Sequence, residues 1–166
     1  PRAQSRLDVA TLGFGYGLGV SPAELAGAYT VFANEGARVA PTLLARRNGD
    51  PIERTPVFSP AATRATLALL RATVREGTGR AADVPGLSIA GKTGTAEKLG
   101  APGAYDENRM LSSFAAIFPA TDPRYVIVLA LDEPARTAAT GGHATGGAVA
   151  ARPGGQIAAR IAAMLG

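Results

Sequence analysis

Three apolar stretches follow one another in the second half of the chain, and only short connections separate them. Residues 87–96, 110–118 and 125–131 have the composition of strands, while the links at 99–108 and 119–123 are rich in turn-forming residues. Links of this length are too short for the crossover that parallel strands require, so consecutive strands should pair antiparallel. The chain is therefore restricted to folds that contain an antiparallel sheet.

Helix signals flank the predicted sheet. The run Ser21-Pro22-Ala23-Glu24 combines a capping Ser, a Pro at the first helical position and a Glu three residues after the cap, which predicts a helix over residues 22–34. Ser59-Pro60 opens a second helix that should end at Gly77, and residues 155–165 have the apolar spacing of a third. The side chains expected to face inward on the first two helices are Leu25, Tyr29, Phe32, Ala33, Leu67, Leu70 and Val74.

A turn cluster separates two further extended stretches. Arg46-Arg47-Asn48-Gly49-Asp50-Pro51 lies between residues 39–44 and 52–58, which predicts a short surface hairpin. With 46% hydrophobic and 18% charged residues, the composition is that of a globular chain with one packed core. We therefore expect a single α+β unit over residues 1–166.

The composition excludes several kinds of site and partner. The chain has no Cys and one His, so we expect no zinc or iron–sulfur site, no disulfide and no Cys nucleophile. We also expect no cofactor. Lys and Arg outnumber Asp and Glu by 17 to 13, but the Arg residues are scattered and aromatic residues make up 5%, so we expect no nucleic-acid partner. The longest strongly apolar run, Tyr125 to Leu131, is far shorter than the roughly 20 residues that span a membrane. We expect no membrane contact from this segment.

The run from Gly86 to Thr93 matches G-x-x-x-x-G-K-[ST], the phosphate-binding P-loop, letter for letter. A P-loop requires a buried strand before the first Gly and a helix directly after the Lys. Here the predicted strand lies inside the motif, and Gly94 and Gly100 follow it. The sequence therefore argues against nucleotide binding.

The same region contains Lys92-Thr93-Gly94, the K-T-G element of penicillin-binding proteins and class A β-lactamases. The Lys supplies positive charge, the hydroxyls of Thr93 and Thr95 flank the site, and Gly94 allows a substrate to lie against the backbone. We expect a twist or bulge near Gly94 to align the two hydroxyls. A solvated Lys on a strand edge, with Thr present for its strand propensity, is the alternative for a lone triplet.

The K-T-G element is accompanied by further stretches. They are Gly13-Phe14-Gly15-Tyr16-Gly17, Val20-Ser21-Pro22-Ala23-Glu24-Leu25-Ala26, Glu76-Gly77-Thr78-Gly79-Arg80-Ala81-Ala82, Phe114 to Pro119, Asp122-Pro123-Arg124-Tyr125 and Asp132-Glu133-Pro134. With Ala90 to Ala96, they make nearly the whole chain resemble the C-terminal half of the transpeptidase domain of class B penicillin-binding proteins. The resemblance is greatest to the division-specific peptidoglycan D,D-transpeptidases.

This resemblance implies a fold of the penicillin-binding transpeptidase and serine β-lactamase type, present in part as three antiparallel strands and helices of a usually five-stranded sheet. It implies acyl transfer, in which an active Ser attacks a D-Ala-D-Ala stem peptide, releases D-Ala and passes the acyl group to an amine. β-Lactams acylate the same Ser. Lys92 and Thr95 would be catalytic, Lys92 in the proton network and the Thr95 N–H as an oxyanion-hole donor. Thr93, Gly94 and Thr95 would bind the substrate.

The chain departs from the family in two places. The nucleophile motif S-x-x-K and the motif S-x-N have no match before Gly13, and Ser88, Ser112 and Ser113 lack a Lys three residues later. We expect the chain alone to be inactive. The run His143-Ala144-Thr145-Gly146-Gly147 stands where many relatives place aromatic residues before a Gly pair, and we expect its His to be solvated.

Two alternatives to the transpeptidase stay open. A serine β-lactamase or D,D-carboxypeptidase shares the K-T-G element. The rate at which the acyl-enzyme of the intact protein deacylates would distinguish these enzymes from a transpeptidase. A non-catalytic module that binds cell-wall peptide would have kept the fold without the nucleophile.

The resemblance also implies partners and a location. The ligands would be peptidoglycan stem peptides and β-lactams, the partners would be membrane proteins of the division complex, and the segment would belong to the periplasmic domain of an inner-membrane-anchored parent. Without an upstream half, the strand at 125–131 would offer an open apolar edge. If about 400 Å² of apolar surface stays exposed to water, roughly 10 kcal/mol of hydrophobic stabilisation is lost at ~25 cal/mol per Å². This loss is comparable with the stability of a whole domain. We expect the chain alone to be unstable or to aggregate.

Overall fold

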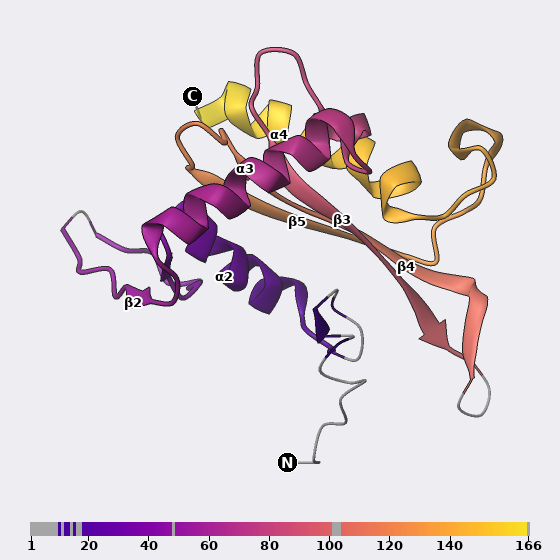
Figure 1. Cartoon of the computed structure of the whole chain (residues 1–166), viewed down its shortest axis with the longest axis horizontal. Coiled ribbons are helices and arrows are strands. Elements are labelled where there is room, and N and C mark those ends of the chain that lie inside the picture. Colours follow the sequence, from indigo (N-terminus) through magenta and orange to yellow (C-terminus); the bar gives the residue numbers. More distant parts are fainter. Residues whose placement is uncertain are drawn as a thin grey trace.

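Figure 1 shows the computed structural model of the chain, which describes residues 10, 12, 13, 15, 18–47, 49–100 and 104–165. The helices are α2 (Pro22–Ala33), α3 (Pro60–Glu76) and α4 (Ala151–Leu165), and the short helical turns are η1 (Arg80–Ala82), η3 (Ala138–Thr140) and η4 (Gly146–Ala150). The strands are β1 (Ala37–Arg38), β2 (Thr55–Pro56), β3 (Ala90–Leu99), β4 (Tyr105–Phe118) and β5 (Tyr125–Asp132). In this view, the long strands run between α3 and α4 above and α2 below.

The strands β3, β4 and β5 form an antiparallel sheet in that order, which confirms the predicted meander. Among the described residues, β3 and β5 are its two edges. The predicted strand ends are wrong at two points. β3 begins at Ala90 rather than at residue 87, and pairing with β4 continues to Leu99 opposite Tyr105, within the stretch expected to be a link. Ion pairs of Lys98 with Asp132 and Glu133 stabilise this extension. These pairs join residues far apart in the sequence, so local turn propensity could not predict them.

The helix α2 begins at the predicted residue. Ser21 Oγ accepts a hydrogen bond from the Glu24 N–H (3.2 Å), and the Glu24 carboxylate accepts one from the Ser21 N–H (2.7 Å), so the predicted capping box is present. The chain turns away from the helix at Gly36, whose φ is 97°. The most buried residues of α2 are Gly27 and Val31, while the four residues predicted to face inward are half-buried.

The predicted surface hairpin is present, but its strands are much shorter than expected, and the first of them lies before the predicted stretch 39–44. Only two residue pairs form, Ala37 opposite Pro56 and Arg38 opposite Thr55. A proline at position 41 interrupts the first predicted stretch, and a proline lacks the N–H that a strand ladder needs. The rest of the segment between β1 and β2 is irregular.

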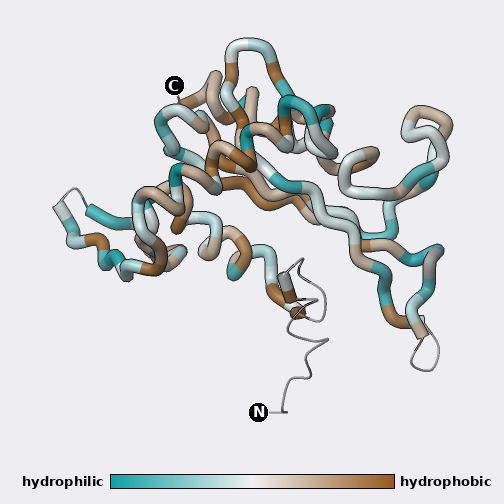
Figure 2. Tube along the Cα trace, viewed as in Figure 1, coloured by the Kyte–Doolittle hydropathy of each residue, from teal (hydrophilic) through white to brown (hydrophobic). Residues whose placement is uncertain are grey.

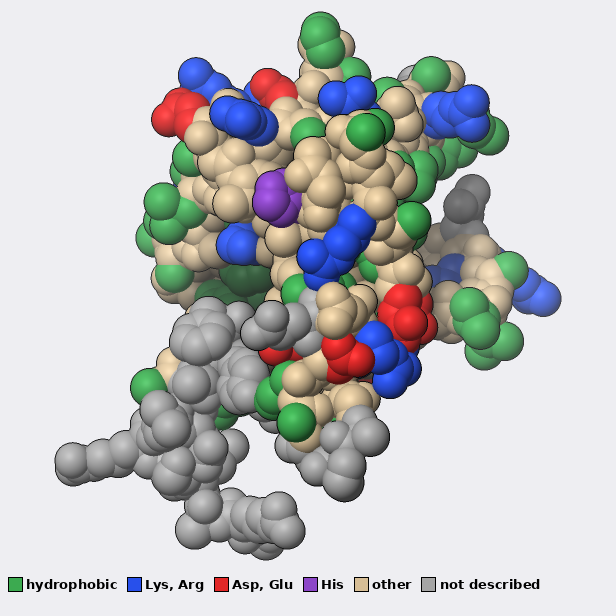
Figure 3. All heavy atoms as spheres, turned by 90° about the vertical axis from the view of Figure 1, so that its right-hand side faces the viewer, with side chains coloured by type: hydrophobic (Ala, Val, Ile, Leu, Met, Phe, Trp, Pro, Cys, Tyr) green, Lys and Arg blue, Asp and Glu red, His purple; other side chains and the backbone are tan. Residues whose placement is uncertain are grey.

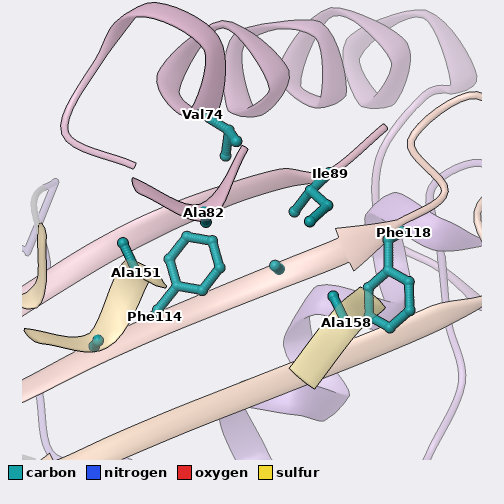
Figure 4. Packing of buried hydrophobic residues seen from close by; sticks show 9 residues of the cluster. Val74, Ala82, Ile89, Phe114, Phe118, Ala151 and Ala158 are labelled. Carbon is teal, nitrogen blue, oxygen red and sulfur yellow. The ribbon is translucent and has the colours of Figure 1, made fainter. Parts of the chain in front are cut away.

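One face of the sheet carries the main core. The predicted helix α3 is present, and its Val74 is fully buried together with Ile89, Phe114 and Phe118. Figure 4 shows these side chains meeting between α3, the strands and α4. In Figure 2, the hydrophobic stretch of β5 lies at the centre of the molecule, which agrees with its side chains packing against this cluster.

The helix α4 begins four residues before the predicted start, directly after the π-helical turn η4. Two consecutive glycines, Gly154 and Gly155, lie buried inside it, although glycine is a poor helix former. A Cβ at Gly154 would lie 2.4 Å from Cδ1 of Phe114, and one at Gly155 would lie 2.6 Å from the Ala82 carbonyl oxygen. The glycines therefore allow α4 to approach the sheet closely. In the described part of the chain, no helix is both long and apolar enough to cross a membrane.

Candidate active site

The strand β3 places Lys92, Thr93, Gly94 and Thr95 in succession at one edge of the described sheet. Its pairing with β4 runs without a register shift from Ala90 to Glu97, and the irregularity follows Glu97. The bulge expected near Gly94 is therefore wrong. It is also unnecessary, because residues two apart in a regular strand point to the same face, so Thr93 and Thr95 are already aligned.

The structure rejects the P-loop. Gly86 forms a turn with a φ of 82°, and residues 90–99 continue as β3, so Lys92 lies within a strand. Lys92 is followed directly by strand residues up to Leu99, whereas a phosphate cradle requires a helix N-terminus there.

The first hydroxyl of the site is held by a residue from another segment. Thr93 is 8% exposed, and its Oγ1 lies 2.8 Å from Oγ1 of Thr78, in a hydrogen bond for which either hydroxyl can donate. Thr78 follows the end of α3, just before η1. The pair fixes the Thr93 side chain and joins the end of α3 to β3.

Lys92 and Gly94 alternate with the two Thr residues along the strand. Lys92 Nζ donates a hydrogen bond to the carbonyl oxygen of the adjacent Thr93 (2.7 Å). A Cβ at Gly94 would lie 2.5 Å from Oγ of Ser113, its partner on β4. A larger residue at this position would therefore have to displace the Ser113 hydroxyl, in addition to reducing the room expected for a substrate.

The second hydroxyl is held by the segment that follows β5. Thr95 Oγ1 accepts a hydrogen bond from the Gly146 N–H (3.0 Å). Two residues earlier, the carbonyl oxygen of Ala144 accepts a hydrogen bond from the hydroxyl of Ser112, which is fully buried. The segment of residues 137–146, which we call the 137–146 loop, is therefore fastened to both β3 and β4.

His143 lies in the 137–146 loop with its side chain exposed, as expected for a solvated His. Figure 3 shows the imidazole, in purple, on the surface of this end of the molecule. Among the described residues, no group of three His, Cys, Asp or Glu side chains comes together in a way that could hold a metal ion.

An ion-pair cluster lies at the far end of β3 from Lys92. Lys98 Nζ contacts Asp132 (2.8 Å) and Glu133 (2.7 Å), and Nε of Arg109 contacts Glu133 (2.9 Å). Hydrogen bonds with Asp132 and then Glu133 raise the pKa of Lys98 above its ordinary value. Hydrogen bonds from Lys98 and then Arg109 lower the pKa of Glu133. The cluster ties the β3–β4 hairpin to the end of β5.

Sequence reasoning missed the roles of Thr78, Ser112 and Gly146. Thr78 belongs to one of the resembling stretches, and Ser112 was considered only as a nucleophile. Their hydrogen bonds join residues 15, 32 and 51 positions apart, so no local spacing could have revealed them. Of the glycine-rich stretch Gly13–Gly17, residues 14, 16 and 17 lie outside the described part of the chain.

Chemically, the β3 edge offers one ammonium group and two hydroxyl groups within four consecutive residues. Both hydroxyls have one hydrogen bond that orients them, and a hydroxyl with one bond made keeps capacity for a second. Such an arrangement suits recognition of an anionic group beside an extended backbone.

Comparison with known proteins identifies the family. Residues 1–159 match the model of the penicillin-binding protein transpeptidase domain. The chain is 40% identical over its whole length to a protein named probable peptidoglycan D,D-transpeptidase FtsI of Caulobacter vibrioides, and 38% identical over 83% of its length to probable peptidoglycan D,D-transpeptidase PbpC of Pseudomonas aeruginosa. It spans 30% and 24% of the lengths of these relatives.

Solved structures agree with the sequence comparison. The apo transpeptidase domain of Burkholderia pseudomallei penicillin-binding protein 3 superposes with a TM-score of 0.81 at 34% identity, over 95% of this chain and 47% of that one. Penicillin-binding protein 3 of Mycobacterium tuberculosis, solved in complex with aztreonam, gives a TM-score of 0.80 at 31% identity, over 92% and 37%. The expected partial α+β fold of the penicillin-binding transpeptidase type is confirmed. The chain belongs to the penicillin-binding protein transpeptidase domain family.

Proposed function

We propose that residues 1–166 form the C-terminal portion of the transpeptidase domain of a peptidoglycan D,D-transpeptidase that cross-links the cell wall at division. The observation that carries the proposal is the K-T-G element on an unpaired edge of the described sheet, in a chain that belongs to this family. The names of the relatives favour the transpeptidase over a β-lactamase or a D,D-carboxypeptidase.

The proposed reaction is acyl transfer through an acyl-enzyme. A serine hydroxyl from the part of the domain outside this chain attacks the penultimate D-Ala carbonyl of a stem peptide, the C–N bond to the terminal D-Ala breaks, and that D-Ala leaves with the proton. The amine of a neighbouring stem peptide then attacks the ester and releases the serine. β-Lactams acylate the same serine, and relatives of this chain have been solved with ampicillin and aztreonam.

In this reaction, Thr95 acts through its backbone and its side chain. The Thr93 carbonyl oxygen accepts a hydrogen bond from Lys92 Nζ. This bond supports the view that the carbonyl points to the free edge of β3. Backbone groups two residues apart on a strand point the same way, so the Thr95 N–H would face the same edge and act as an oxyanion-hole donor. Loss of such a donor typically lowers the rate by about 10² to 10³.

The remaining site residues bind the substrate and move protons. The hydroxyls of Thr93 and Thr95 donate to the terminal carboxylate of the stem peptide or the carboxylate of a β-lactam, and Gly94 lets the ligand lie along the strand. Lys92 supplies positive charge to the proton and hydrogen-bond network around the serine. The proposed setting is the periplasmic domain of an inner-membrane-anchored protein, with membrane proteins of the division complex as partners.

The test has two steps. The gene upstream of the Pro1 codon is read in frame for S-x-x-K followed by S-x-N, and the complete gene product is then treated with a fluorescent penicillin. We expect both motifs, a covalent label on the serine, and slow deacylation. An upstream sequence without S-x-x-K would favour the non-catalytic binding module, and fast deacylation would favour a β-lactamase.

Two lysines of β3 provide a matched pair of variants. Lys92→Ala should abolish labelling or slow it by at least about 10². Lys98→Ala removes a lysine of the same strand that is bound in the ion-pair cluster, and it should keep the wild-type labelling rate. Equal rates for the two variants would contradict the role given to Lys92.

A further inference from the structure

The hydroxyl of Ser112 lies on the central strand β4, not on the β3 edge that carries the candidate site, and it makes a hydrogen bond to a loop that contacts this site. Ser112 is fully buried in β4 and donates a hydrogen bond to the carbonyl of Ala144, a buried residue with 6% of its surface exposed. A buried carbonyl needs a partner, and the serine supplies it. This bond fixes the end of the 137–146 loop to the central strand.

The fixed end of the loop lies directly beside Thr95. Ser112 and Thr95 are opposite one another in the β3–β4 register, so their side chains lie on the same face of the sheet. Gly146, two residues after Ala144, donates its N–H to Thr95 Oγ1 (3.0 Å). A hydroxyl on β4 thus holds the loop, and an amide of the loop holds a hydroxyl on β3.

The contact of Gly146 with the sheet leaves the loop little freedom. A Cβ at Gly146 would lie 2.4 Å from the Gly94 carbonyl oxygen and 2.6 Å from that of Ser113, so this backbone rests directly on the paired strands. The position of the Gly146 N–H consequently depends on the contacts that fix the 137–146 loop to the sheet.

The hydrogen bond from Gly146 also sets the direction of the Thr95 proton. A hydroxyl has one proton and two lone pairs, and here an amide occupies a lone pair. The Thr95 O–H therefore points away from Gly146 and is available to another acceptor. An anionic acceptor would form a short, charge-assisted hydrogen bond there.

We propose that Ser112 is a positioning residue for the carboxylate-binding site. By holding Ala144, it keeps the Gly146 N–H on Thr95 and so aims the Thr95 hydroxyl at the carboxylate of the stem peptide or β-lactam. This inference rests on the proposed function. It differs from a purely structural role, because it requires that the effect of Ser112 depend on the charge of the ligand.

The experiment compares a penicillin with its carboxylate methyl ester on the complete gene product. The second-order acylation rate constant is measured for each compound, per active site titrated with a fluorescent penicillin, so that unfolded molecules do not count. For Ser112→Ala, we expect the acid to react about tenfold more slowly while the ester changes little, so that the acid-to-ester ratio falls. Ser113→Ala, which removes the neighbouring hydroxyl on the opposite face of β4, should keep the wild-type ratio.

Two further variants separate position from stability. Ser112→Thr keeps the hydroxyl and should keep the ratio even where its extra methyl group lowers the melting temperature. Adding Ser112→Ala to Thr95→Ala should lower the ratio no further than Thr95→Ala alone, because Ser112 acts through Thr95.

The outcomes are distinguishable. Equal losses for acid and ester in Ser112→Ala, or a lower melting temperature with an unchanged ratio, would overturn the positioning role and leave the proposed function intact. A wild-type protein that no penicillin acylates would overturn the proposed function and this inference together.

Discussion

Replacing Gly154 by Ala tests whether close contact between α4 and the sheet holds the core together. The new Cβ would lie 2.4 Å from Cδ1 and 3.1 Å from Cε1 of Phe114, whereas carbon atoms pack best at about 3.5–4.0 Å. The ring has no free side to move to. It is fully buried, and a Cβ placed at Gly91 would lie 2.7 Å from its Cζ. The ring is therefore in close contact with both Gly154 and Gly91.

Two opposing effects set the size of the change. Replacing a helical Gly by Ala favours the helix by about 1 kcal/mol, and overpacking a rigid core costs about 1–3 kcal/mol or more. The overlap exceeds 1 Å at a ring that cannot move, so we place the cost toward the upper end and expect a net loss of roughly 2 kcal/mol. A loss of this size lowers the melting temperature by about 4–8 °C in a domain of 150–250 residues and by less in a larger one, so for the complete gene product we expect a fall of roughly 4 °C.

The assay is thermal unfolding of the complete gene product, followed by circular dichroism or a dye. Gly19→Ala is the matched control, because no atom lies within 4 Å of a Cβ there, and its melting temperature should stay within about 2 °C of the wild type. Adding Phe114→Leu to Gly154→Ala should recover part of the loss. A Gly154→Ala protein that melts above the wild type would show that helix propensity outweighs the contact and would refute this reasoning.

Four further predictions concern the Thr78–Thr93 pair, the ion-pair cluster and the β5 edge of the described sheet. Thr78→Val removes the hydrogen-bond partner of the Thr93 hydroxyl, so the protein should lose about 0.5–1.5 kcal/mol in thermal unfolding; an unchanged melting temperature would argue against the pair. Because the pKa of Glu133 is lowered on folding, the stability that its ion pairs contribute should be present above pH 4.5 and lost as the pH falls through the lowered pKa. The difference in melting temperature between wild type and Glu133→Gln should therefore vanish in acid. A constant difference from neutral to strongly acidic pH would contradict this. Because the pKa of Lys98 is raised on folding, the stability that its ion pairs contribute should be present below pH 10.5 and lost as the pH rises through the raised pKa. The difference in melting temperature between wild type and Lys98→Met, which keeps most of the side-chain stem, should shrink in alkali, and a difference that stays constant would contradict this. Finally, the isolated 166-residue chain should aggregate or unfold without cooperativity, since β5 is an edge of the described sheet, and a sharp transition in a monomer by calorimetry would disprove it.

Local chemistry in the sequence was enough to define most helices and the order of the strands. The capping residues Ser21 and Ser59, each followed by a proline, determine where α2 and α3 begin, because a cap and a fixed φ act within one helical turn. The short links around β4 determine the antiparallel order, because no crossover fits into them. The K-T-G element and the stretches around it were also sufficient to indicate the family.

Tertiary structure decided the features that depend on distant partners. The start of α4 could not be read from the sequence, because glycines, which disfavour an isolated helix, are needed for its contact with Phe114 and Ala82. The support of the candidate site was equally hidden. Thr78 and Ser112 are ordinary residues in the sequence, and only folding brings one to Thr93 and the other, through the 137–146 loop, to Thr95. Sequence determines what can form within a few residues, whereas hydrogen bonds between segments depend on how the whole sheet and its covering helices pack.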